Sequence, residues 1–83
     1  MRFRFTDLNP FPLPGTNGKF IHLATIQYGL REFIYFTQKD THLTWIEEIT
    51  GGKLIEITDD NLWNDLAMFV TEKNVGRFYN HDA

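Results

Sequence analysis

The sequence contains no cysteine and no serine among its 83 residues. The absence of cysteine excludes disulfide bonds and thiolate zinc sites, which support many proteins of this size. Serine and cysteine nucleophiles are excluded as well, and no glycine-rich phosphate loop or His-Glu-x-x-His helix motif stands in their place. These absences predict a non-enzymatic protein without a metal or another cofactor.

Long apolar runs are also missing from the chain. No segment approaches the roughly 20 apolar residues that a membrane span requires. The opening residues Met1-Arg2-Phe3-Arg4 do not lead into the apolar stretch of a signal peptide. We therefore expect a cytoplasmic protein that does not enter a membrane.

Aromatic residues, by contrast, are abundant. The chain has eight Phe, three Tyr and two Trp, and each ring can bury about 150 to 250 Å². A chain this short buries only about 60 to 65% of the surface that its unfolded form exposes. The excess predicts self-association, with a homodimer as the first expectation. The expected interface anchors are Phe3, Phe5, Phe11 and Phe78; the alternative is that these rings pack within their own domain.

Charge is unevenly distributed along the chain. Basic residues outnumber acidic ones in residues 1–39, whereas residues 40–72 carry eight acidic residues and a single lysine. The net charge of −3 argues against a protein built mainly to bind nucleic acid. A basic protein partner could meet the acidic segment, and an inhibitor that imitates nucleic acid through residues 47–72 is one alternative. The candidate acidic recognition face comprises Glu47, Glu48, Glu56, Asp60 and Asp65; the ordinary interpretation is a solvated surface.

The N-terminal third combines a strand with a proline-rich segment. Phe3 and Phe5 alternate with Arg2 and Arg4, which predicts an edge strand with arginines on its outer face. The same mixture of rings and guanidinium groups could bind single-stranded nucleic acid weakly. Residues 9–18 contain three prolines and two glycines, which predict a loop.

Three further segments predict strands. Residues 19–28 are rich in β-branched residues and favour a strand, with a helix as the competing interpretation. Residues 31–37 are apolar on both faces, which predicts a central strand. Residues 43–49 alternate so that Trp45 and Ile49 share one face and Ile46 takes the other.

The Gly51-Gly52 pair predicts a hairpin to a strand over residues 54–57. A two-residue loop would place Glu47 opposite Glu56, a like-charge contact that costs about 0.2 to 1 kcal/mol. A three-residue loop, with Gly52 left-handed in a bulge, would place Glu47 opposite Ile55 instead. We expect the three-residue loop.

An amphipathic helix is expected after the hairpin. Asp59 and its neighbours can cap a helix N-terminus, and the apolar residues that follow occupy one arc of a helical wheel. These are Leu62, Trp63, Leu66, Ala67, Phe69 and Val70. The predicted fold is therefore a single α+β domain over residues 1–83. It has an antiparallel sheet of four or five strands in meander order, which could curl into a small, partly open barrel. One C-terminal helix packs on the sheet, and residues 77–83 form a loose tail.

The three histidines offer little chemistry. His22 lies among apolar residues of a strand, so we expect a structural imidazole. Asp40 and His42 would share a face of a strand and could form a metal or acid–base pair, but two ligands do not make a site. His81 falls in the expected tail.

Overall fold

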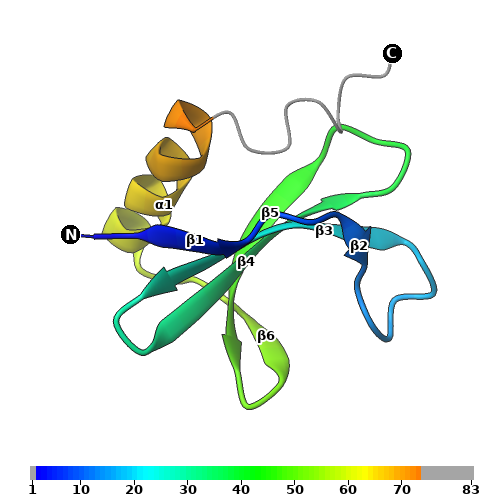
Figure 1. Cartoon of the computed structure of the whole chain (residues 1–83), viewed down its shortest axis with the longest axis horizontal. Helices are drawn as coiled ribbons and strands as arrows, with labels where there is room; N and C mark the ends of the chain where they lie inside the picture. The colour runs from blue at the N-terminus through cyan, green and yellow to red at the C-terminus, as the bar shows by residue number, and fades with distance from the viewer. Residues whose placement is uncertain (1, 74–83) are drawn as a thin grey trace.

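The structure, a computed structural model, describes residues 2–73 as an antiparallel sheet with one helix packed on it (Figure 1). The elements are β1 (Arg4–Asp7), β2 (Phe11–Pro12), β3 (Phe20–Tyr28), β4 (Arg31–Gln38), β5 (Thr44–Thr50), β6 (Lys53–Glu56) and α1 (Asp60–Glu72). The α+β class, the strand over residues 19–28 and the helix after the hairpin are confirmed. The expected tail, including Phe78, lies outside the described residues.

The sheet has six strands in the order β1-β3-β4-β5-β6, and β2 pairs with β3 beside β1. The sheet thus exceeds the expected four or five strands, because Phe11 and Pro12, within the expected loop over residues 9–18, pair with His22 and Ile21. Proline is tolerated there because β2 is an edge strand. The expectation of a barrel is wrong, because β1 and β6 lie at opposite ends of the sheet and do not pair. Instead of closing on itself, the sheet buries one face beneath α1.

The main core lies between α1 and the sheet. Leu62, Leu66 and Val70 recur every four residues and form the buried face of α1. They pack against Ile26 and Phe33 of the two central strands and against Ile46 of β5. Asp59 caps the helix, since its carboxylate accepts hydrogen bonds from the backbone N–H groups of Asn61 and Leu62 at 3.0 and 3.2 Å. The cap therefore stabilises the N-terminus of α1 directly after the hairpin.

The hairpin register differs from the one expected. Glu47 pairs with Glu56, and Thr50 pairs with Lys53, so the loop has two residues, Gly51 and Gly52. Both glycines have positive φ, 58° and 79°, as a type I′ turn requires. The twist of this turn matches the twist of the flanking strands. The expectation of a three-residue loop is wrong, because the type I′ turn at Gly51 and Gly52 outweighs the like-charge contact between Glu47 and Glu56.

Candidate interaction surfaces

The sheet face opposite α1 carries a second apolar cluster. Leu13, Ile34 and Phe36 are buried in it, and Phe20, Trp45 and Ile49 pack against them. Leu13 comes from the proline-rich segment and is fixed by its backbone N–H, which donates to the Phe20 carbonyl at 2.9 Å. The segment therefore covers part of this face rather than acting as a free linker.

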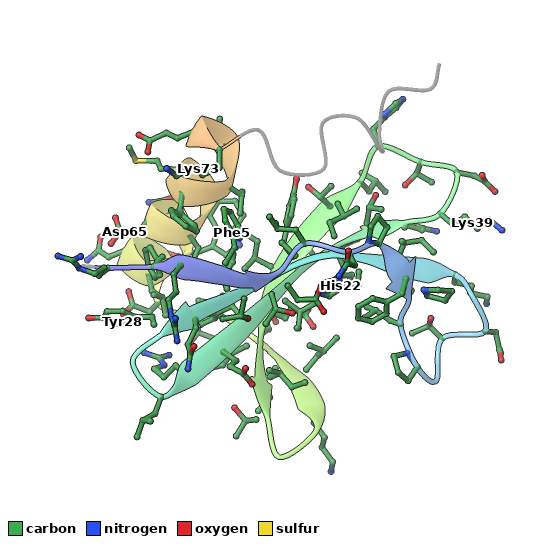
Figure 2. All side chains as sticks on the ribbon, in the orientation of Figure 1. Phe5, His22, Tyr28, Lys39, Asp65 and Lys73 are labelled. Atoms are coloured by element: carbon green, nitrogen blue, oxygen red, sulfur yellow. The ribbon has the colours of Figure 1, made fainter. Side chains whose placement is uncertain are left out.

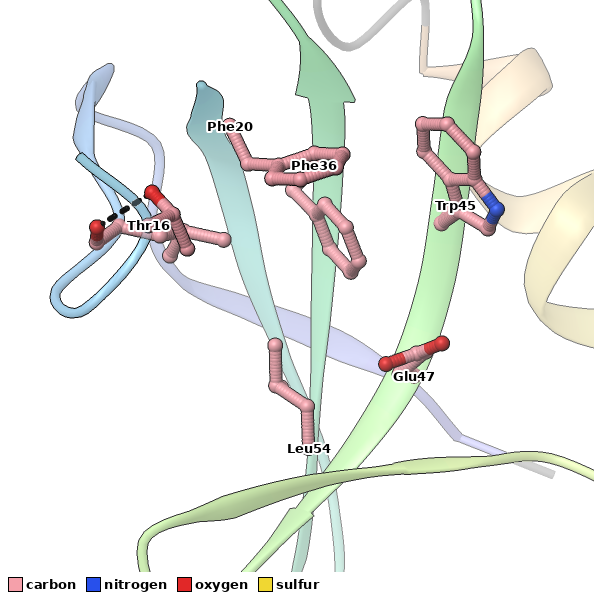
Figure 3. A pocket seen from close by; sticks show the side chains of 7 residues that line it. Thr16, Phe20, Phe36, Trp45, Glu47 and Leu54 are labelled. Atoms are coloured by element: carbon pink, nitrogen blue, oxygen red, sulfur yellow. Dashed lines mark hydrogen bonds between the residues drawn. The ribbon is translucent and has the colours of Figure 1, made fainter. Parts of the chain in front are cut away.

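A pocket of about 370 Å³ opens in this face (Figure 3). Its walls come from the proline-rich segment and from four strands, and the lining residues are Leu13, Thr16, Phe20, Phe36, Trp45, Glu47 and Leu54. The rings of Phe36 and Trp45 are nearly parallel, with centroids 5.8 Å apart. The Phe20 ring stands edge-on to both, at 5.8 Å from Phe36 and 5.6 Å from Trp45. Three aromatic rings and one carboxylate thus line the same pocket.

Two of the expected interface anchors are used inside the domain. Phe5 lies between β1 and α1 (Figure 2) and stacks on Phe69 at 4.6 Å. Phe3 contacts Phe69 at 5.5 Å and Tyr28 at 5.3 Å. These contacts follow the alternative in which the rings pack within their own domain, and they leave little ring surface for nucleic acid bases. On the outer face of β1, Arg4 donates from Nη2 to Oε1 of Gln27 at 2.8 Å.

Of the other two expected anchors, only Phe11 lies within the described residues. Phe11 stacks on His22 with ring centroids 4.2 Å apart and remains 38% exposed. Phe78 lies outside the described residues. Phe11 is thus the one expected anchor within residues 2–73 that combines an internal contact with a large exposed fraction.

The five expected acidic residues do not form one continuous face. Neighbours along a strand point to opposite faces, so Glu47 lies with Trp45 on the pocket face and Glu48 lies on the α1 face. Glu56 shares the face of Glu47, which it opposes directly. Asp60 and Asp65 are exposed on α1, and Figure 2 shows Asp65 there. The acidic segment therefore forms several small surfaces instead of one.

Glu48 is paired with Arg31 on the α1 face. The guanidinium donates from Nε to Oε2 at 2.9 Å and from Nη2 to Oε1 at 2.8 Å. These hydrogen bonds lower the pKa of the Glu48 carboxyl and raise the pKa of Arg31, against the opposing effect of burial. The Arg31 guanidinium also lies 5.3 Å from the ring centroid of Phe33. A carboxylate beside an aromatic ring is thus satisfied by an arginine of the same chain.

His22 is the structural imidazole that the sequence predicts. It is fully buried, with Nδ1 2.7 Å from the Asn9 carbonyl and Nε2 2.7 Å from Oγ1 of Thr25. Because a carbonyl can only accept, Nδ1 carries the proton and donates. A register shift in β3 between His22 and Ala24 brings His22 and Thr25 to the same face, as a β-bulge does. His22 therefore anchors the proline-rich segment to the sheet.

Asp40 and His42 do not lie on a strand as expected. They belong to the connection between β4 and β5, where Asp40 has a positive φ of 67° and both side chains are exposed. Within residues 2–73, no group of three His, Cys, Asp or Glu side chains is arranged to hold a metal ion. The pair therefore gains no third ligand from the described part of the chain.

The edges of the sheet differ in how they are protected. At one end of the sheet, β1 begins with Arg4 and ends with Asp7, and its pairing with β3 is irregular. Strand β2 follows Pro10 and ends at Pro12. Charges, bulges and prolines of this kind prevent a strand from pairing with another chain. At the other end, β6 carries Lys53 and Glu56, but it contains no proline and its pairing with β5 is regular.

Strand β6 is a bare edge. All four of its residues are exposed, including Leu54 at 37% and Ile55 at 49%. No strand of residues 2–73 pairs with its outer side. The β5–β6 hairpin also projects from the rest of the sheet (Figure 1). Such an edge offers unpaired backbone groups to another strand.

Comparison of the chain with protein-family models, with curated proteins and with solved structures finds no match. In the part of the chain that the structure describes, no helix is both long and apolar enough to cross a membrane.

The sequence pointed to some of these features and missed others. The alternation over residues 43–49 separates Trp45 from Ile46, which marks Trp45 as belonging to a second apolar surface. Nothing in the pattern links Leu13 or Phe20 to that surface, because they approach it through the loop and the central strands. The sequence indicates β6 only by a short apolar run after Gly52 and does not indicate that the strand lies at the edge of the sheet.

Proposed function

We propose that the protein is a non-enzymatic interaction domain that self-associates by pairing β6 with β6 of a second copy. The observation that carries this proposal is the exposed edge of β6, which pairs regularly with β5, contains no proline and has no second pairing partner among residues 2–73. Leu54 and Ile55 supply apolar side chains there, one on each face of the sheet. The proposed contact thus moves from the phenylalanines expected from the sequence to the last strand of the sheet.

The hairpin register determines which backbone groups face outward. In a two-residue hairpin the flanking residues, here Thr50 and Lys53, form a hydrogen-bonded pair. Since bonding alternates along an antiparallel strand, Leu54 and Glu56 direct their N–H and C=O groups away from β5. A symmetric antiparallel pairing centred on Ile55 joins Leu54 of each copy to Glu56 of the other. It forms about four backbone hydrogen bonds.

Symmetry also brings apolar surface to this interface. A two-fold axis perpendicular to the sheet keeps the same face of both copies on one side. The two pocket faces then adjoin, and Ile55 of one copy lies across from Ile55 of the partner subunit on the α1 side. Non-hydrogen-bonded pairs of this kind approach closely, with Cα atoms about 4.5 Å apart. Burial of Ile55, now 49% exposed, supports the pairing.

Sedimentation equilibrium of the wild type and of Leu54→Pro tests the proposal. Proline at this position removes an outward-facing N–H, so it leaves the bonds between β5 and β6 in place and blocks the bonds to a second copy. We expect a reversible dimer for the wild type and a monomer for Leu54→Pro. Ile55→Lys, which places two ammonium groups across from each other in the dimer, should also be monomeric.

The matched control is Leu30→Lys. Leu30 is fully exposed (100%) in the turn between β3 and β4, so it tests whether removal of any exposed apolar side chain weakens association. We expect Leu30→Lys to dimerise like the wild type. A wild type that stays monomeric at high concentration would overturn the proposal, and so would dimers of Leu54→Pro and Ile55→Lys with unchanged affinity.

A further inference from the structure

The α1 face of the sheet shows how this protein satisfies a carboxylate beside an aromatic ring. Glu48 lies directly across from Phe33 on the neighbouring strand. Arg31 completes the arrangement with a two-bond fork to the Glu48 carboxylate and a guanidinium 5.3 Å from the Phe33 centroid. Ring, carboxylate and guanidinium form one unit.

The pocket face contains the ring and the carboxylate but no matching cation among the described residues. Glu47 is the neighbour of Glu48 along β5 and points to the opposite face. It lines the same pocket as Phe36 and Trp45 and is half-buried, and its direct neighbour on β4 is Ile34. Within residues 2–73, Glu47 has neither a salt bridge nor a side-chain hydrogen bond. Its direct neighbour across the hairpin is a second carboxylate, Glu56, which makes a cation at this place still more favourable.

The polar groups that face the pocket are acceptors. Besides the Glu47 carboxylate, the pocket has the Thr16 hydroxyl, which donates its proton to the Leu13 carbonyl at 2.8 Å. Its oxygen is therefore left to accept hydrogen bonds. The indole nitrogen of Trp45 points away from Phe20 and Phe36 (Figure 3). A ligand that fits these groups is a hydrogen-bond donor.

The aromatic walls favour a planar cation. The faces of aromatic rings carry negative electrostatic potential, and a guanidinium group stacks on them. Trp45 is half-buried and stacks on the buried Phe36 with an interplanar angle of 17°, so the accessible aromatic surface of the pocket comes mainly from Trp45. The Leu13 and Leu54 side chains, also in the lining, provide apolar contacts for an aliphatic stem.

We propose that this pocket binds an arginine side chain of a basic protein partner. A guanidinium has five N–H donors and no acceptor, and its fork matches a carboxylate. In the pocket it donates to Glu47 and contacts the accessible part of the Trp45 ring, a combination of carboxylate and aromatic contacts that Arg31 makes with Glu48 and Phe33 on the other face. The site does not require self-association, because all seven residues that line the pocket belong to one chain.

Titration with the capped peptide acetyl-Gly-Arg-Gly-amide, followed by fluorescence, tests the proposal. The half-exposed Trp63 (44%) is replaced in a Trp63→Phe background, which leaves Trp45 in the pocket as the reporter. We expect saturable binding of the arginine peptide. The same peptide with citrulline, which has nearly the same shape and no charge, should bind at least about tenfold more weakly. The lysine peptide should also bind more weakly, because an ammonium group cannot form the planar fork.

Two variants locate the binding. Glu47→Gln keeps the shape of the side chain and removes a like-charge contact in the hairpin, so the variant should fold at least as well as the parent. It should weaken binding of the arginine peptide roughly tenfold. Asp65→Asn, the matched control on α1, removes one negative charge elsewhere and should leave binding unchanged.

Three results would overturn the proposal. The first is equal binding of the citrulline or lysine peptide, and the second is unchanged binding to Glu47→Gln. The third is an equal loss for Asp65→Asn and Glu47→Gln, which would indicate general attraction to an acidic protein. Backbone amide shifts at Thr16, Phe20 and Leu54 during the titration provide a second readout, and perturbations confined to other residues would also exclude the pocket.

Discussion

Glu47 lies directly across from Glu56 in the β5–β6 hairpin, so two carboxylates face each other on the exposed part of the sheet. The tight turn at Gly51 and Gly52 imposes this contact, because both glycines adopt the positive φ that a type I′ turn requires. The same register directs the backbone of Leu54 and Glu56 outward and leaves Glu47 at the mouth of the pocket. One local feature thus underlies both proposed interaction sites.

Removing this like-charge contact should stabilise the fold. We expect Glu56→Gln to raise the free energy of unfolding by about 0.2 to 1 kcal/mol, measured by urea denaturation at low salt. In a Glu47→Gln background, Glu56→Gln should raise the free energy of unfolding very little, because the repulsion between the two carboxylates is already absent. A double-mutant cycle without coupling between the two positions would show that the carboxylates do not interact.

The ion pair between Arg31 and Glu48 should make stability depend on pH. Because the guanidinium holds the pKa of Glu48 below its ordinary value of 4.5, the pair stabilises the folded state above that value. The contribution is lost as the pH falls through the lowered pKa of the folded state.

Comparison with Glu48→Gln isolates this effect. The side chains of Arg31 and Glu48 remain 48% and 24% exposed, so solvent screening limits the wild-type advantage at neutral pH to about 0.2 to 1 kcal/mol. The difference in unfolding free energy between the two proteins should shrink in acid. A difference that is the same at neutral and strongly acidic pH would contradict the assignment.

The helix cap at Asp59 should contribute measurably to stability. Asp59→Ala removes the acceptor for the N–H groups of Asn61 and Leu62, and we expect a loss of about 1 kcal/mol in chemical denaturation. Asp60→Ala is the control, since Asp60 lies in the first turn and accepts neither of these bonds. An equal loss for both variants would show that the effect comes from charge near the helix dipole and not from capping.

The sequence predicted those parts of the fold that depend on local signals. The β-branched residues identified residues 19–28 as a strand, and Asp59 with the apolar spacing after it identified the helix. The hairpin was also predicted, but its register was not. The unfavourable contact between Glu47 and Glu56 could be estimated from the sequence, whereas the better match of a two-residue turn to twisted strands outweighed it.

The interaction surfaces were harder to predict because they depend on contacts between distant segments. Strand alternation alone places Glu47 and Glu48 on opposite faces, so the division of the acidic residues could have been foreseen. The packing of Phe3 and Phe5 inside the domain could not be foreseen, because it depends on the position of Phe69 on the helix. The pocket likewise requires Leu13 of the proline-rich segment and Leu54 of the last strand, which are distant in the sequence, to line the same space as the three rings.

Isotope-filtered NMR on a mixture of labelled and unlabelled protein tests self-association through β6 most directly. Pairing centred on Ile55 predicts nuclear Overhauser contacts between Ile55 and the partner's Ile55, and between Leu54 and Glu56 of the partner subunit. The contacts should disappear in Leu54→Pro and persist in Leu30→Lys. A dimer whose contacts between chains lie elsewhere, or a protein that shows none at high concentration, would contradict pairing through β6.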